Sequence, residues 1–206
     1  GGIYLVDSGL SKDDPDRVKD GWETVKTIVS RIRKLVINIL FFAKERELKR
    51  EPTDVLNFAY DVAAGVESKI KAEGIVLEYD FDTSLGEIQI DAGVVRLALI
   101  NILENALDAC VEDIAKKSHK IVFSLKPGKN TIVFEIRDDG IGMDRETRES
   151  LFTLFFSSKG SKGTGLGLFI ANKIIEQHGG KIKVNSQPNR GSSFRITIPQ
   201  ISPGSD

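Results

Sequence analysis

KGTGLGLFIANKIIEQHGG, residues 162–180, joins a glycine-rich loop to the start of an apolar helix. Gly163, Gly165 and Gly167 fall within five positions, and glycine permits positive φ angles and a close approach of the backbone to a ligand. The N–H groups at the start of the helix, near Leu166, carry partial positive charge and favour an anion such as phosphate. The glycine loop (residues 163–168) therefore predicts a phosphate site, although a tight turn without any ligand explains the same residues.

Two common nucleotide-binding loops are excluded by the residues around these glycines. A dinucleotide-binding fingerprint beginning at Gly163 or Gly165 would need glycine at position 168 or 170, where the chain has Leu168 and Ile170. The sequence contains no Gly-Lys-Ser or Gly-Lys-Thr, so a P-loop is excluded as well. The role of the glycine loop must therefore be inferred from the rest of the chain.

The composition is that of a globular protein with one domain and an appendage, or with two small domains. The 206 residues are 40% hydrophobic and 29% charged. The formal net charge of −1 gives no reason to expect a nucleic-acid partner. Cys110, the single cysteine, is expected to be a buried thiol, and His119 and His178 lack metal-ligand spacing, so no structural zinc is expected.

The sequence gives no reason to expect a membrane span or a signal peptide. No apolar stretch approaches the ~20 residues of a membrane span, and the N-terminus lacks a signal-peptide pattern. The chain opens without methionine in GGIYLV, which suggests a piece of a longer protein. We expect a cytoplasmic location, with membrane contact only through upstream regions that are missing from this sequence.

The first part of the chain predicts a long helix with one apolar face. Asp14 can cap this helix, and Pro15 suits its first position. A face of this length needs a partner helix, which favours a bundle or a homodimer through residues 15–45 over packing on the chain's own domain. GGIYLV is expected to be the end of another helix, and DSGLSKDD the bend between the two. The apolar positions alternate at intervals of four and three: Val18, Trp22, Val25, Val29, Ile32, Val36, Ile39 and Ala43.

The second part predicts an α+β fold, a two-layer α/β sandwich in which helices cover one face of a mixed sheet. Glu51-Pro52 marks the boundary between domains at 1–52 and 53–206. Amphipathic helices are expected from about Asp54 to Ala72, after the cap residue Asp91, and from about Leu166. The predicted strands are IVLEYDF (75–81), the hairpin KIVFSL (120–125) and TIVFEIRD (131–138), and the pair KIKVNS (181–186) and FRITIP (194–199).

Three polar side chains interrupt the apolar helix that follows Asp91. Asn101, Asn105 and Asp108 recur at intervals of four and three, so they share one helix face, with Glu104 beside them. Asparagine and aspartate are poor helix formers, so their presence in a buried helix needs a reason. They form either a magnesium site, because amide and carboxylate oxygens suit Mg²⁺, or hydrogen-bonded support for a neighbouring loop.

Two further segments between this helix and the glycine loop carry functional signals. In IRDDGIGMD (136–144), a carboxylate at a strand end can accept a hydrogen bond from an exocyclic amine, while Gly140 and Gly142 would admit a flat ring, although a plain turn has the same residues. The polar stretch 145–163 contains Phe152, Phe155 and Phe156. These phenylalanines either complete the core or fasten a lid over a ligand.

Four ordered segments, NILENALDAC, RDDGIGM, LFTLFF and GTGLGL, resemble the N, G1, F and G2 boxes of the sensor histidine kinases. Those kinases belong to the ATPase superfamily shared with gyrase, Hsp90 and MutL. The resemblance runs from about Thr53 to Pro199 and implies a Bergerat-type ATP-binding fold. Residues 1–52 are similar to the end of the first helix and the whole second helix of the family's dimerisation and phosphotransfer hairpin.

The resemblance implies roles for individual residues. Asn101, Glu104 and Asn105 form the expected catalytic set, in which Asn105 is the Mg²⁺ ligand and Asn101 faces the phosphates. Asp138 reads the adenine amine, and Gly140 and Gly142 form a hinge. The full set expected to bind ATP or ADP is Asn101, Asn105, Asp108, Asp138, Gly140, Gly142, Met143, Phe152, Lys159, Lys162, Gly163, Thr164, Gly165, Leu166, Gly167 and Leu168. The two lysines of this set would lie in the lid, where a solvated position is equally expected.

The family's phosphate acceptor is missing from this sequence. The kinases transfer the γ-phosphate to a histidine on the first hairpin helix, whereas His119 precedes a strand and His178 precedes Gly179-Gly180. We read His178 as a helix C-terminal residue that is favourable to the helix dipole. The resemblance therefore implies the catalytic core of a histidine kinase that passes phosphate on to a response-regulator receiver domain. This chain alone is not expected to phosphorylate itself.

Two alternatives remain open at this point. An ATP-hydrolysing clamp of the same superfamily would carry a glutamate four residues before the metal-binding asparagine, where this chain has Asn101, although Glu104 is close by. A non-catalytic module would use the nucleotide only to set the shape of a dimer.

Overall fold

The computed structural model describes residues 1–43, 47–157 and 164–200, which form two compact units, Gly1–Arg46 and Glu47–Asp206. The second unit begins earlier than the expected boundary at residues 52 and 53. Strand β1 (Glu51–Asp54) pairs antiparallel with β3 (Glu87–Ile90), so that boundary would cut through a strand of the second unit. None of the helices in the described part of the chain combines the length and the apolar character that crossing a membrane requires.

The first unit is a pair of helices, α1 (Gly2–Ser11) and α2 (Pro15–Ala43), which pack against each other. Glycines bring the two backbones close: a Cβ atom on Gly9 would lie 2.7 Å from Val18 Cγ2, and one on Gly21 would lie 2.7 Å from the Val6 nitrogen. The bend between the two helices is shorter than the expected segment DSGLSKDD (7–14), because α1 continues through Gly9 to Ser11. Asp14 caps α2 as predicted, since its carboxylate accepts the Arg17 N–H at 3.1 Å.

The apolar face of α2 is largely uncovered in this single chain. Trp22 is 56% exposed, and Val29, Ile32 and Val36 are similarly exposed. Because α1 is only 10 residues long against 29 in α2, it covers only one end of its longer partner.

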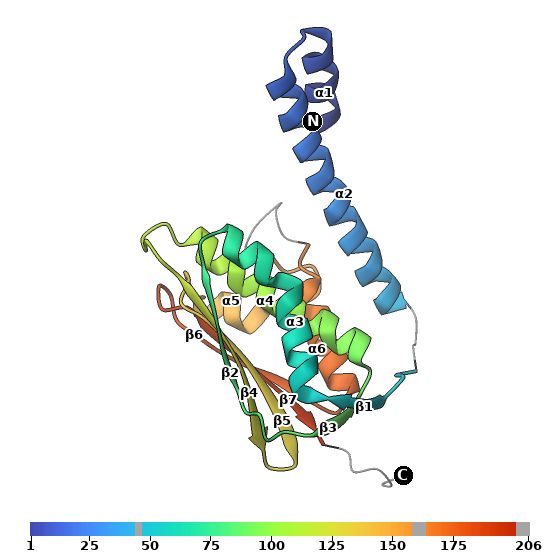
Figure 1. The fold of residues 1–206 in the computed structure, drawn as a ribbon, viewed down its shortest axis with the longest axis vertical. Coiled ribbons are helices and arrows are strands. Elements are labelled where there is room, and N and C mark those ends of the chain that lie inside the picture. Colours follow the sequence, from blue (N-terminus) through green and yellow to red (C-terminus); the bar gives the residue numbers. More distant parts are fainter. Residues whose placement is uncertain (44–46, 158–163, 201–206) are drawn as a thin grey trace. The chain divides into compact units, whose positions relative to one another are not determined.

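The second unit is a two-layer α/β sandwich, as the sequence predicted (Figure 1). A five-stranded mixed sheet has the order β2-β4-β5-β7-β6, in which β2 pairs parallel with β4 and the other pairs are antiparallel. Three helices, α3 (Val55–Ala72), α4 (Ala92–Glu112) and α6 (Gly167–Gln177), cover one face. The strands are β2 (Val76–Phe81), β4 (Lys120–Gly128), β5 (Thr131–Asp138), β6 (Lys181–Ser186) and β7 (Ser192–Pro199), and a short helix α5 spans Arg145–Ser150.

The core lies between the sheet and this helical layer. Alternate residues of β4 and β5 are fully buried, and Phe123 stacks on Phe134 with ring centroids 6.4 Å apart. Phe58 of α3 meets Phe134 edge to face. Helix α4 is buried on several sides, and Asp91 caps it by accepting the Val94 N–H. This buried, capped helix is the element on which the candidate site is built.

Candidate functional site

Asp138 ends β5 as a buried carboxylate. It is 3% exposed, and its Oδ1 atom accepts hydrogen bonds from the N–H groups of Gly140 at 3.0 Å and Ser192 at 3.2 Å. Burial raises the pKa of Asp138 to about 6, and the two N–H donors oppose this shift. At neutral pH the group is therefore mainly ionised, so it can only accept hydrogen bonds.

The glycines that follow Asp138 are required by protein packing. A Cβ atom on Gly140 would overlap the carbonyl of Ala109 and lie 2.7 Å from the Cys110 nitrogen, both in the last turns of α4. Gly142 has φ of 65°, and a Cβ atom there would lie 2.8 Å from the Gln187 carbonyl carbon. The close approach of α4 and of the β6–β7 turn is thus a reason for these glycines that the sequence did not show, beside the expected admission of a flat ring.

Two serines that the sequence analysis did not identify support this region. Ser186 ends β6 and Ser192 begins β7, and their hydroxyl oxygens lie 3.0 Å apart in a buried position. The Ser186 hydroxyl donates to the Gly191 carbonyl at 3.0 Å and accepts the Met143 N–H at 2.8 Å. The signal in the sequence is a serine at each end of the QPNRG turn (187–191), which connects the two strands.

The polar face of α4 contains an unsatisfied amide. Asn101 is 1% exposed, and among the described residues neither its Oδ1 nor its Nδ2 atom has a hydrogen-bond partner. A buried unpaired polar group costs about 1–3 kcal/mol, so both amide atoms are available to a bound water or a ligand. The Asn105 Nδ2 group donates to the backbone carbonyl of Asn101 at 2.7 Å. Because a carbonyl can only accept, this bond fixes the amide and directs Asn105 Oδ1 away from that carbonyl.

Glu104 and Asp108 have different surroundings from Asn101. Glu104 forms an ion pair with Lys69 of α3, with Oε1 and Nζ 2.6 Å apart. Asn101 instead faces α6, since a Cβ atom on Gly167 would lie 3.5 Å from Asn101 Oδ1. Asp108 is exposed near the end of α4. The structure thus brings Asn101 and Gly167 together and turns Glu104 toward a different helix.

The start of α6 has no side-chain cap. Leu166 occupies the N-cap position, is buried, and makes no capping hydrogen bond with its side chain. Thr164 Oγ1 accepts the Leu166 N–H at 3.4 Å, one residue before the helix begins. An uncapped helix N-terminus beside the unpaired Asn101 amide has the donor groups that an anionic ligand requires. Leu168 lies in the first turn and is half-buried.

The phenylalanine segment (residues 151–156) is bonded to the glycine loop. The Phe155 N–H donates to the Gly165 carbonyl at 3.1 Å, and both residues have positive φ angles, 64° and 65°. Positive φ is strained for a bulky residue, and the Phe155 side chain is 69% exposed. Phe152 and Phe156 are half-buried. Lys159, Lys162 and Gly163 lie outside the described residues.

His178 is buried and neutral. Its Nδ1 atom lies 2.7 Å from the Ile174 carbonyl and must donate, whereas its Nε2 atom accepts the Asp91 N–H at 3.1 Å. Burial lowers the pKa of His178 in addition. His178 ends α6 as expected and donates to one of its last carbonyls, but the ring carries a single proton and also joins the end of α6 to the start of α4.

A family model described as "Histidine kinase-, DNA gyrase B-, and HSP90-like ATPase" matches residues 90–202. That range contains Asn101, Asp138 and the glycine loop. The chain belongs to this ATPase family. Membership confirms the expected fold and agrees with ATP as the nucleotide.

Relatives of this ATPase domain are sensor kinases. The chain is 29% identical over 188 residues to the sensor kinase CckA of Brucella abortus, a match that covers 86% of this chain and 20% of CckA. It is 28% identical over 199 residues to the sensor histidine kinase ZraS of Salmonella typhi, covering 94% of this chain and 42% of ZraS. The chain thus spans less than half the length of these relatives.

Solved structures show the same fold. The catalytic domain of the histidine kinase ThkA is 27% identical with a TM-score of 0.65, and the match covers 74% of this chain and 96% of that one. ThkA in complex with the response regulator protein TrrA is 25% identical with a TM-score of 0.75, covering 98% of this chain and 58% of that one. The family, the α+β fold and the likeness to histidine kinases are therefore as the sequence predicted.

Proposed function

We propose that this chain is the ATP-binding catalytic core of a protein histidine kinase, which transfers the γ-phosphate of ATP to a histidine. The observation that carries the proposal is the unpaired Asn101 amide, buried beside the uncapped start of α6. Membership of the ATPase family and the sensor kinases among the relatives support the same reading.

The nucleotide would lie along α4. The contact of Gly140 with Ala109 is eight residues beyond Asn101, or about 12 Å along the helix axis. Asp138 would accept the adenine amine at the Ala109 end, between the Gly140–Met143 turn and Phe152. Asn101 and the first N–H groups of α6 would hold the phosphates at the other end. The spacing of the two ends suits an extended nucleoside triphosphate.

Asn105 would hold Mg²⁺ through its Oδ1 atom, because its Nδ2 atom is occupied by the Asn101 carbonyl. The ion would neutralise charge on the phosphate groups during transfer. The protein's own contribution is to fix the direction of the Asn105 oxygen, and the i to i+4 hydrogen bond on α4 does so before any ligand arrives.

The residue four positions before Asn105 favours transfer of the γ-phosphate to a histidine over hydrolysis of ATP. Asn101 stands there, and an amide cannot remove a proton from water. Glu104, the remaining candidate base, is paired with Lys69, and this ion pair holds its carboxylate toward α3. The clamp and the non-catalytic dimer module therefore remain as the weaker alternatives.

The remaining partners follow from the same reading. A response-regulator receiver domain would take the phosphate, in line with the ThkA structure that contains TrrA. Two copies of the chain would pair through the exposed apolar face of α2. We place the domain in the cytoplasm, where ATP is available.

The test supplies the purified chain with γ-labelled ATP, Mg²⁺ and a separate hairpin that carries a histidine. We expect acid-labile label on the hairpin, and loss of that label in the Asp138→Asn variant. Release of labelled inorganic phosphate, with no label on the hairpin, would support the ATP-hydrolysing clamp instead. Binding of ATP with neither product would support the non-catalytic module.

A further inference from the structure

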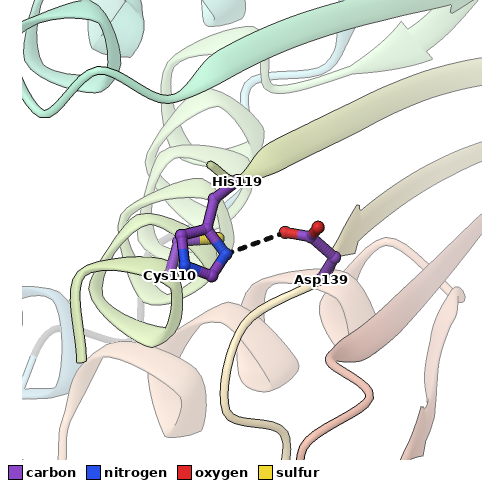
Figure 2. Close-up of side chains that lie close together, drawn as sticks. All are labelled: Cys110, His119 and Asp139. Carbon is purple, nitrogen blue, oxygen red and sulfur yellow. Dashed lines mark hydrogen bonds and ion pairs between the residues drawn. The ribbon is translucent and has the colours of Figure 1, made fainter. Parts of the chain in front are cut away.

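Cys110, His119 and Asp139 form a compact cluster, in which Asp139 directly follows Asp138 in the chain (Figure 2). Cys110 lies in the last turn of α4, His119 directly precedes β4, and Asp139 directly follows β5. One ligand atom from each residue lies within 4.8 Å of the other two. His119 Nδ1 and Asp139 Oδ1 are only 3.1 Å apart.

The hydrogen bonds of His119 direct one ring nitrogen into this cluster. Its Nε2 atom lies 3.1 Å from the Asp113 carbonyl oxygen, which can only accept, so Nε2 carries the hydrogen. The Nδ1 atom then faces a carboxylate and a thiol across the cluster. Metal-binding histidines are commonly oriented in this way, with one nitrogen held by a backbone carbonyl. The Nδ1 atom pairs with the Asp139 carboxylate in the metal-free chain, so an ion would have to replace that contact.

We propose that Cys110 Sγ, His119 Nδ1 and Asp139 Oδ1 bind one Zn²⁺ ion, with a fourth position open to water. A thiolate, an imidazole and a carboxylate are ligands that Zn²⁺ accepts together, whereas Mg²⁺ avoids sulfur. Ligands of a tetrahedral Zn²⁺ ion lie about 3.4–3.6 Å from one another. The nitrogen–oxygen pair is already close to that spacing, and the sulfur lies within 4.8 Å of both atoms.

Charge balance also fits a divalent ion. The Cys110 thiol releases its proton into solvent when the Zn–S bond forms. The resulting thiolate and carboxylate together neutralise the ion, which suits a cluster in which Cys110 and His119 are nearly inaccessible to solvent.

Lys116 is the natural competitor for this ion. Its Nζ atom lies 3.4 Å from Asp139 Oδ2 and also donates to the Asp139 backbone carbonyl. The ammonium group therefore supplies positive charge to the carboxylate that would bind Zn²⁺. Because Lys116 is at the surface, its removal leaves the three ligands and the core packing intact.

The first experiment titrates Zn²⁺ into the metal-free chain in the absence of nucleotide, with calorimetry as the readout. We expect one ion per chain, and a loss of affinity of about 100-fold or more in Cys110→Ser. Lys116→Gln should tighten binding about twofold to fivefold, which is the scale of a surface ion pair. Asn105→Ala should bind Zn²⁺ as the parent does, which separates this site from the proposed magnesium site.

The second experiment replaces Zn²⁺ with Co²⁺ and records the near-ultraviolet spectrum of the unmodified chain. A thiolate-to-cobalt charge-transfer band, absent in Cys110→Ser, is the expected result. Absence of this band in the parent chain, or undiminished Zn²⁺ binding by a folded Cys110→Ser variant, would overturn the proposal. The spectrum of the unmodified chain alone can overturn the proposed zinc site, so the test does not depend on whether the variant folds. Neither outcome tests the proposed kinase activity.

Discussion

The Phe155 N–H donates to the carbonyl oxygen of Gly165 at 3.1 Å, so the phenylalanine segment and the glycine loop are joined through their backbones. The contact is so close that a Cβ atom on Gly165 would lie 2.7 Å from Phe155 Cα. Gly165 also has a positive φ angle, which disfavours any other residue. The two segments are therefore in close backbone contact, and we expect a change in one to affect the start of α6.

Gly165→Ala should separate these segments. The added methyl group overlaps the Phe155 backbone, and relief of that overlap displaces the loop beside Asn101. We expect ATP affinity to fall about tenfold or more, since strain of this kind is worth about 1–3 kcal/mol. Gly86→Ala is the matched control, because a Cβ atom there meets nothing within 4 Å. Equal ATP affinities of the two variants by calorimetry would contradict the proposed role of the loop.

ATP affinity should depend on the ionisation of Asp138. The adenine amine donates, so the nucleotide binds the carboxylate and not the protonated acid. Because burial raises the pKa of Asp138 to about 6, affinity should be full above pH 7 and should fall as the pH drops through 6. Asp138→Asn should weaken binding by about 1.5–3 kcal/mol at pH 7.5. The phosphates of ATP titrate as well, so the measurement is the difference between the pH profiles of the parent and the variant. Parallel profiles would reject the assignment of Asp138.

Local pattern was enough to predict the elements around the site. Asp91 caps its helix as expected, because an acceptor side chain before an apolar run acts over only three residues. Asp54, expected only as the approximate start of a helix, caps α3 in the same way. The β4–β5 hairpin and the shared face of Asn101 and Asn105 are likewise visible in short stretches. The four motifs also occur in the order found in the histidine kinases, and this order predicted the family to which the chain belongs.

Features created by contacts between distant segments could not be predicted in this way. Strand β1 has four residues and contains Pro52, so it shows no alternation, and only its pairing with β3 makes it a strand. The neutral state of His178 depends on Asp91, 87 residues away, and the second donor to Asp138 comes from Ser192, 54 residues away. The Cys110, His119 and Asp139 cluster escaped notice for the same reason, because its spacing matches no local metal motif.

Asn105→Ala should damage phosphate transfer more than nucleotide binding. The substitution removes the proposed metal-binding oxygen but leaves Asp138 and the start of α6 in place. We expect the transfer rate to fall about 100-fold while the Kd of ADP stays within about threefold. Asn105→Asp, which keeps an oxygen but loses the donor to the Asn101 carbonyl, should be less impaired. An equal loss of binding and transfer would make Asn105 a structural residue.

The exposed face of α2 should mediate self-association. Ile32→Glu places a charge on the apolar stripe, and sedimentation should then show a monomer where the parent chain dimerises. Thr27→Glu adds the same charge at an exposed position off the stripe and should leave the dimer intact. ATP affinity should be unchanged in both variants, because the binding residues lie in the separate second unit. A monomeric parent chain at high concentration would contradict this prediction.

The chain should incorporate no phosphate of its own from labelled ATP, since neither of its histidines can act as a nucleophile. Both ring nitrogens of His178 are engaged, by the Ile174 carbonyl and the Asp91 N–H, and the ring is buried. His119 is 9% exposed, with its nitrogens held by Asp113 and Asp139. The same preparation should label a separate hairpin that carries a histidine, although slowly, because transfer between molecules lacks the effective concentration of a covalent tether. That positive reaction is the control for an active preparation. Label on a peptide containing His119 or His178, found by mass spectrometry under conditions that preserve phosphohistidine, would show that the chain contains its own acceptor.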